Sequence, residues 1–145
     1  MTALIERPTD GRSRLRRAAA PAATIAGLGL ASLALTLRDP HVQGSWGVCP
    51  SYALFGVYCP GCGGLRAVND LGHLDVAGAA HSNLVFVALV PLVVFFLGRW
   101  LLDAWQGRVR PPGLLASKAF YLSLGAVLVV FTLWRNLPGG TWLQP

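Results

Sequence analysis

Charged residues are scarce in this chain. Asp, Glu, Lys and Arg make up 12% of its 145 residues, whereas a soluble globular domain carries about a quarter. Too few polar side chains are available to cover a soluble globule, and 54% of the residues are hydrophobic. This composition excludes a disordered chain and a coiled coil, and the length excludes a large multi-domain enzyme. With a mean hydropathy of +0.53, the chain has the composition of an integral membrane protein.

Acidic residues are the scarcer of the two charges, six against twelve Lys and Arg, which gives a formal net charge of +6. A protein that binds nucleic acid presents its basic residues on a folded polar face. Here five of the twelve lie in the first seventeen residues, directly before an apolar run: Arg7, Arg12, Arg14, Arg16 and Arg17. Basic residues gather in this way on the cytoplasmic side of a membrane span, so no nucleic-acid partner is expected.

Three apolar runs predict three transmembrane helices and therefore an all-α fold. Residues 18–37 are twenty consecutive uncharged positions, and about twenty residues cross the hydrocarbon core of a bilayer. The second predicted span is 76–98, which Asp75 would cap and Pro91 would kink. The third is 119–134, a shorter run. The lipid bilayer is thus the first expected partner.

The charges of the connecting segments predict the orientation. The basic arm 1–17 and the loop 99–118 together carry nine of the twelve Lys and Arg, and the segments 38–75 and 135–145 carry three. The more basic side of a membrane protein faces the cytoplasm. We therefore expect a multi-pass protein of the plasma membrane with a cytoplasmic N-terminus and an extracytoplasmic C-terminus.

Cysteine is also scarce, and the three cysteines all lie within the fourteen residues 49–62. An odd number cannot form a closed set of intramolecular disulfides. All three fall in the predicted outer segment 38–75, where we expect one or two short helices. Their clustering indicates a local site.

One interpretation of the cysteines is a metal site. The run 59–63, Cys-Pro-Gly-Cys-Gly, is the turn with which zinc ribbons direct two sulfurs at one ion. A structural zinc site needs four ligands, and Cys49 followed by Pro50 is only part of a second turn. One histidine among His41, His73 and His81 would have to complete it. The expected ligands of such a zinc-type site are Cys49, Cys59, Cys62 and His73.

Two further interpretations stay open. Cys59 and Cys62 form a C-x-x-C pair before a possible helix at 64–71, and Arg66 in its first turn would favour a reactive thiolate. However, the βαβ setting of a thioredoxin-like motif is missing. Alternatively, Cys49 pairs with one of the other two in a disulfide that staples the outer loop, as an extracytoplasmic compartment allows.

Four short motifs resemble one family. They are Cys49-Pro50, the block 59–67 (CPGCGGLRA), Asn83-Leu84, and the run 135–138 (Arg-Asn-Leu-Pro). Together they are similar to short bacterial membrane proteins of the domain-of-unknown-function family 2752, and the resemblance extends from Val48 to Pro145. Members commonly have Asn-Pro where this chain has Asn83-Leu84. The family has no established activity, so the resemblance implies a membrane protein and marks its motif positions, which besides the cysteines are Pro60, Gly61, Gly63, Arg66, Asn83, Arg135 and Asn136.

The sequence has no paired carboxylates, nucleophile triad, phosphate-binding loop or dinucleotide turn. We therefore expect a non-enzymatic accessory subunit whose outer loop, ordered by the cysteines, meets a membrane-protein partner or a second copy of the chain. A metal-binding membrane module and a membrane thiol–disulfide oxidoreductase are the alternatives.

Overall fold

The computed structural model describes residues 11–42, 44–109, 113 and 117–145. In this part of the chain every regular element is a helix, which confirms the all-α prediction. The elements in order are α1 (Gly11–Leu37), α2 (Pro50–Phe55), α3 (Gly64–Gly72), α4 (Val76–Gln106), α5 (Lys118–Arg135) and the 3-10 helix η2 (Pro138–Leu143).

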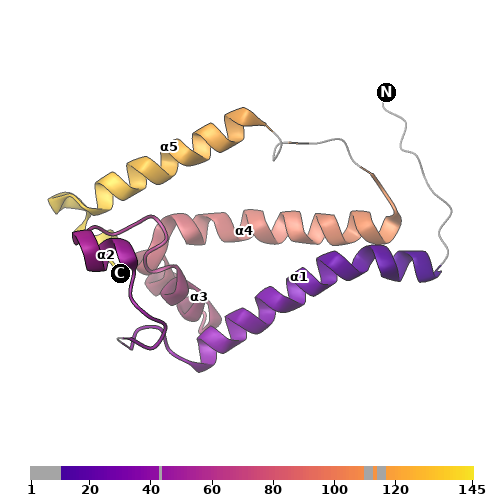
Figure 1. Cartoon of the computed structure of the whole chain (residues 1–145), viewed down its shortest axis with the longest axis horizontal. Helices are drawn as coiled ribbons and strands as arrows, with labels where there is room; N and C mark the ends of the chain where they lie inside the picture. Colours follow the sequence, from indigo (N-terminus) through magenta and orange to yellow (C-terminus); the bar gives the residue numbers. More distant parts are fainter. Residues whose placement is uncertain (1–10, 43, 110–112, 114–116) are drawn as a thin grey trace.

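The helices α1, α4 and α5 are each long and apolar enough to cross a membrane, as the three apolar runs predict. Most of their large apolar side chains are exposed in the isolated chain, which is the pattern of surfaces that face lipid. Figure 1 shows that the end of α1, the start of α4 and the end of α5 lie at the same end of the molecule, together with α2 and α3. The short helices of the predicted outer segment therefore cluster at one end of the long ones.

Two of the long helices extend beyond the predicted spans. Helix α1 includes part of the basic arm, and α4 continues to Gln106 rather than ending at residue 98. The side chain of Arg17 explains how these ends are held together, because its Nε donates to the carbonyl oxygen of Ala104 at 3.2 Å. Carbonyl groups in the last turn of a helix have no partner within the helix, and a guanidinium satisfies one here.

Parts of two predicted segments cannot be compared with the structure. Residues 1–10 of the basic arm and residues 110–112 and 114–116 of the loop before α5 lie outside the described residues. Arg108 and Lys118, which belong to the same predicted loop, are described.

Helix α4 is interrupted near its N-terminal end. Asp75 caps it as predicted, since its Oδ1 accepts a hydrogen bond from the amide of Gly78 at 2.8 Å. Pro91 lies inside the helix, and the expected kink there stays a prediction; the residue with non-helical dihedrals is Asn83, at φ −162° and ψ 94°. Its Oδ1 accepts from the amide of Phe86 at 3.0 Å, so Asn83 acts as the N-cap of the long remainder of the helix.

The buried core lies at the end of the molecule that holds α2 and α3, where α3 packs against both α4 and α1. Ala67 of α3 and Ala79 of α4 are both fully buried, and their small side chains permit the close approach of the two helices. The core also contains polar side chains: Asn69, for example, donates to the carbonyl oxygen of Leu35 at the end of α1 at 2.8 Å. A polar core at one end and apolar surfaces along the helices are what a membrane protein requires.

Candidate metal centre

Cys49 is positioned by the start of α2. It is the residue directly before that helix, and its carbonyl oxygen accepts from the amide of Ala53 at 2.9 Å. Pro50 occupies the first helical position, where its fixed φ favours helix formation and its missing amide costs nothing. The Cys-Pro pair thus begins a helix and holds the sulfur at its start.

The run 59–62 forms a tight turn. The amide of Cys62 donates to the carbonyl oxygen of Cys59 at 3.1 Å, and the amide of Cys59 donates to Sγ of Cys62 at 3.2 Å. Gly63 follows at φ +79°, and a Cβ at this position would overlap the carbonyl oxygen of Ser82. A glycine is needed here both for the backbone conformation and for the contact with α4.

The three sulfurs converge on one point. Sγ of Cys49 lies 3.4 Å from that of Cys59 and 2.8 Å from that of Cys62, and the last two are 3.1 Å apart. All three cysteines are free, so the disulfide of the structural interpretation is not formed. The three thiols lie close enough together to bind a metal ion.

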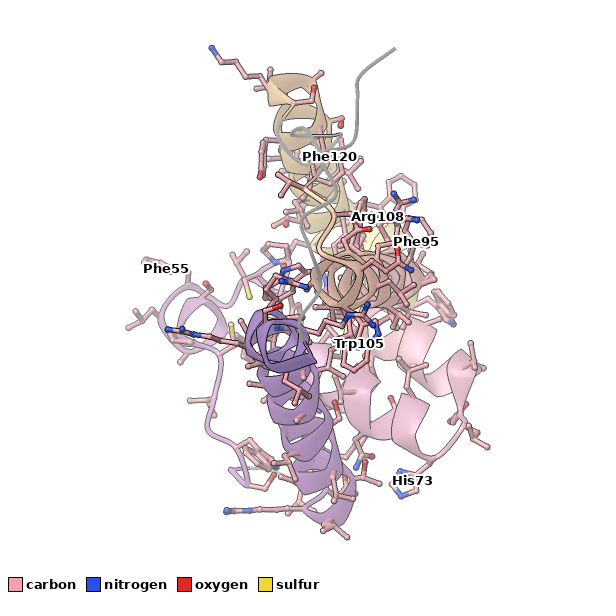
Figure 2. The ribbon with its side chains drawn as sticks, turned by 90° about the vertical axis from the view of Figure 1, so that its right-hand side faces the viewer. Phe55, His73, Phe95, Trp105, Arg108 and Phe120 are labelled. Carbon is pink, nitrogen blue, oxygen red and sulfur yellow. The ribbon has the colours of Figure 1, made fainter. Side chains whose placement is uncertain are left out.

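The histidines do not join the sulfurs. In the described residues the group of candidate ligands consists of the three cysteines alone. His73, the predicted fourth ligand, follows the last residue of α3, and its Nδ1 is 2.9 Å from the carbonyl oxygen of Asn69. The nine residues of α3 span about 14 Å, which separates His73 from the cysteine turn. Figure 2 shows His73 and Phe55 of α2 on opposite sides of α1.

The other two histidines have partners of their own. Nε2 of His41 lies 2.8 Å from Oδ1 of Asp70. The ring of His81 makes an edge contact with Trp142, with ring centroids 5.6 Å apart. The fourth ligand that the sequence analysis sought among the histidines is therefore not present in the cluster.

Arg135 is the cation that contacts the cysteine turn. Its side chain is fully buried, and Nη1 donates to the carbonyl oxygens of Cys59 at 3.0 Å and Cys62 at 3.1 Å. Nε and Nη2 both donate to the carbonyl oxygen of Leu143, at 3.1 and 2.7 Å. The guanidinium also lies over the ring of Phe131, 4.9 Å from its centroid. The redox interpretation expected this cation to be Arg66.

Among the described residues no carboxylate pairs with Arg135. The ion pair found in this part of the chain joins His41 and Asp70. The ionisable groups that act on its charge are the three thiols and the phenol of Tyr58. A buried cation without an opposite charge is unfavourable, because hydrogen bonds to carbonyl dipoles replace only part of its hydration. The cluster of thiols is thus the source from which a compensating negative charge can come.

Two asparagines hold the backbone of the cysteine loop. Nδ2 of Asn83 donates to the carbonyl oxygens of Pro60 at 2.9 Å and Cys62 at 3.1 Å. The side chain of Asn136 forms two hydrogen bonds with Tyr58, accepting from its amide and donating to its carbonyl oxygen, both at 2.9 Å. The structure therefore brings together the motif residues Asn83, Arg135 and Asn136, which are far apart in the sequence, around one turn.

The hydrogen bond between Cys62 and Cys49 shifts the pKa values of these two thiols in opposite directions. The hydrogen bond that Cys62 donates lowers the pKa of Cys49 to about 6. Burial, followed by the same hydrogen bond, raises the pKa of Cys62 to about 12. The first negative charge of the cluster therefore forms on the more accessible cysteine, and the buried cysteine stabilises it by donating a hydrogen bond.

A buried polar chain beside the cluster was not predicted from the sequence. Asp70 accepts from Oγ of Ser82 at 2.8 Å through Oδ2 and pairs with His41 through Oδ1. Because the carboxylate lies between the hydroxyl and the imidazole, this is not a hydrolase triad, in which the histidine contacts the serine. In the sequence, only Asp70, a lone acidic residue within the predicted helix 64–71, could have indicated this chain of hydrogen bonds.

The fold and the site together define a helical multi-pass membrane protein with a three-cysteine cluster at one end. The family described as Protein of unknown function (DUF2752) matches residues 49–97, which confirms the resemblance seen in the sequence. The matched residues contain the cysteines, α3 and Asn83, whereas Arg135 and Asn136 lie outside them. No curated protein and no solved structure matches the chain.

Proposed function

We propose that this protein is a non-enzymatic accessory module of the membrane that holds a divalent metal ion of the zinc type on Cys49, Cys59 and Cys62. The observation that supports this function is the convergence of three free sulfurs beside Arg135, a buried cation with no carboxylate partner. Three thiolates and one divalent ion carry a net charge of −1, which Arg135 balances. Three neutral thiols would leave the buried guanidinium without a counter-charge.

The distances are compatible with this ion. A Zn–S bond of about 2.3 Å places the sulfurs of a tetrahedral site about 3.8 Å apart, whereas they lie 2.8 to 3.4 Å apart in the chain. Small changes of the side-chain torsions within their staggered wells are enough to separate them by this amount. Thiolates are also the donors that zinc and other soft ions prefer.

We propose that this centre lies on the extracytoplasmic side of the plasma membrane. Arg38, Arg66 and Arg135 are the only Lys or Arg residues at that end of the helices, and the other nine belong to the predicted cytoplasmic segments. The smaller positive charge belongs outside. As an accessory module, the protein would act together with a membrane-protein partner or a second copy of itself.

Elemental analysis tests the metal. The protein purified in detergent, without added chelator, should contain one equivalent of a divalent metal per chain, and Cys62→Ser should lose it because a ligand is removed. Ser123→Ala is the matched control, since Ser123 is exposed on α5 and bonds only to the carbonyl oxygen of Phe120. We expect Cys62→Ser also to lower the folded yield more than Arg99→Ala does.

Thiol trapping separates the proposal from the oxidoreductase alternative. Acid quenching of intact cells followed by alkylation should find all three cysteines reduced or metal-protected in every growth condition. Substoichiometric metal combined with a disulfide that forms and disappears reversibly would contradict the metal-binding function. A permanent disulfide without metal would favour the purely structural role of the cysteines.

A further inference from the structure

The cysteine cluster opens onto a pocket of the described residues. This pocket has a volume of about 960 Å³, and the three cysteines contribute to its wall. Ligand sites for small molecules have volumes of roughly 300–1,000 Å³. The pocket is therefore large enough for a small organic ligand to reach the sulfurs.

The two sides of the cluster differ. On the inner side, Asn83 and Arg135 occupy the carbonyl groups of the cysteine turn, and both are buried. On the outer side lies the pocket. Because the described residues supply three ligands and no fourth, a tetrahedral ion held there keeps one coordination position open, as exchangeable and catalytic zinc sites do. Because the three cysteines line the pocket, a fourth ligand could reach such an ion from there.

The walls of the pocket indicate the chemistry of its ligand. Arg66 is the one charged residue among those that line it, and Trp46, Tyr52 and Leu65 contribute apolar surface. The Nε of Arg66 lies 3.4 Å from the carbonyl oxygen of Pro40, which holds the side chain at the pocket wall. A cation beside apolar walls favours an organic anion.

We propose that the pocket binds a small anionic thiol, whose sulfur completes the metal site and whose carboxylate or sulfonate pairs with Arg66. This inference rests on the proposed metal centre. The ligand loses its S–H proton to solvent, and its thiolate replaces water at the metal without any change of oxidation state. The metal with four thiolates carries a charge of −2, of which Arg135 balances one unit, and Arg66 balances the carboxylate or sulfonate of the ligand.

The experiment uses the full chain loaded with Co²⁺ in place of the natural metal and 2-mercaptoethanesulfonate as the ligand. The thiol should increase the sulfur-to-cobalt charge-transfer absorption and saturate at one equivalent. In Arg66→Gln the Kd for this ligand should rise about tenfold, as expected for the loss of a charge-assisted bond, and the Kd for the neutral 2-mercaptoethanol should stay the same. Ethanesulfonate, which has no thiol, should leave the spectrum unchanged.

Arg99→Gln is the matched control, because Arg99 lies in α4 against Phe95 and should behave as the unaltered protein. If Co²⁺ binds at one equivalent and neither thiol changes its spectrum, or if the thiols remove the cobalt, the ligand proposal is overturned and the metal centre stands. An equal loss of affinity for both thiols in Arg66→Gln would also overturn it. If no Co²⁺ binds, both proposals fail together.

Discussion

Arg135 is the residue that joins most parts of the site. One side chain bonds to the carbonyl oxygens of Cys59, Cys62 and Leu143, so the cysteine turn, the end of α5 and the end of η2 share a single anchor. A guanidinium can do this because its donors lie in a rigid planar fork, whereas an ammonium is a point charge. The geometry and the positive charge of the Arg135 guanidinium contribute separately to the metal site, and two substitutions distinguish the two contributions.

We expect Arg135→Lys to retain more metal affinity than Arg135→Gln, because lysine keeps the positive charge beside the thiolates and glutamine removes it. Residues that support metal ligands typically change affinity by about 10–100-fold, and the glutamine variant should lose an amount in this range. Competition with a chromophoric chelator measures it, on protein that elutes as a single species. Equal affinities of the two variants would show that the charge of Arg135 does not act on the metal.

The alkylation of the metal-free protein should distinguish the cysteines. Because the pKa of Cys49 is lowered to about 6, its thiolate exists above that pH, and its alkylation rate should fall as the pH drops through about 6. Cys62, with a pKa raised to about 12, should react slowly at neutral pH. Mass spectrometry of the labelled peptides gives both rates in one sample. Parallel pH profiles for the two cysteines would contradict this assignment.

At the scale of the elements, α4 is the helix that connects the site to the membrane. Its interruption at Asn83 frees that side chain to cap the long part of the helix and to hold the cysteine turn at the same time. In a regular helix the amide of Phe86 would bond to the carbonyl oxygen of Ser82, and the side chain of Asn83 would not cap the helix. The interruption of α4 at Asn83 therefore helps to hold the cysteine turn in place.

Because Asn83 caps the long part of α4, the structure predicts at which positions of this helix a proline is tolerated. Leu84 follows the cap, so its amide needs no partner within the long part of the helix, and proline is favoured at such a position. We expect Leu84→Pro to fold with little change in stability, because the fixed φ of proline suits the first helical position. Ala88→Pro is the control, because an interior proline costs about 3 kcal/mol.

Thermal unfolding in detergent measures both variants. Leu84→Pro should keep a Tm close to that of the unaltered protein, and Ala88→Pro should lower it clearly. Both residues are exposed, so the comparison is not confused by a difference in burial. If the two variants lost stability equally, Asn83 would not act as a helix cap.

At the scale of the whole molecule, three helices of membrane length carry a small polar core at one end. The largest buried side chains include Arg135 and Asn83, both of which belong to that end. Along the rest of α4 the apolar surface is exposed, because in this class of protein lipid covers it. The molecule thus concentrates its chemistry where the helices leave the bilayer.

The orientation of the chain can be tested directly. We expect a reporter enzyme that folds only outside the cytoplasm to be active when fused after Pro145, because the less basic ends of the helices belong outside. The control is the same reporter fused after Gly113, in the predicted cytoplasmic loop, where it should be inactive. Activity in the reverse pattern would place the cysteine cluster in the cytoplasm and remove the proposed extracytoplasmic centre.

Much of the fold follows from the sequence alone. The three spans, the Asp75 cap and the short helix after the cysteine turn are local features, since each depends on residues within a few turns of one another and on the thickness of the bilayer. The spacing of the three cysteines in the sequence was also enough to predict that they form the centre of the site. The orientation remains a prediction.

Only the tertiary structure decided which residues surround the sulfurs. From the sequence, Arg66 and His73 were expected beside the sulfurs because both are close to the cysteines along the chain. However, helix α3 carries His73 away from the sulfurs, and the side chain of Arg66 lies at the pocket wall. The guanidinium that reaches the turn comes from Arg135, which is 73 positions from Cys62. Local patterns determine helices because their hydrogen bonds are local, whereas the partners of a buried charge are set by the packing of distant segments.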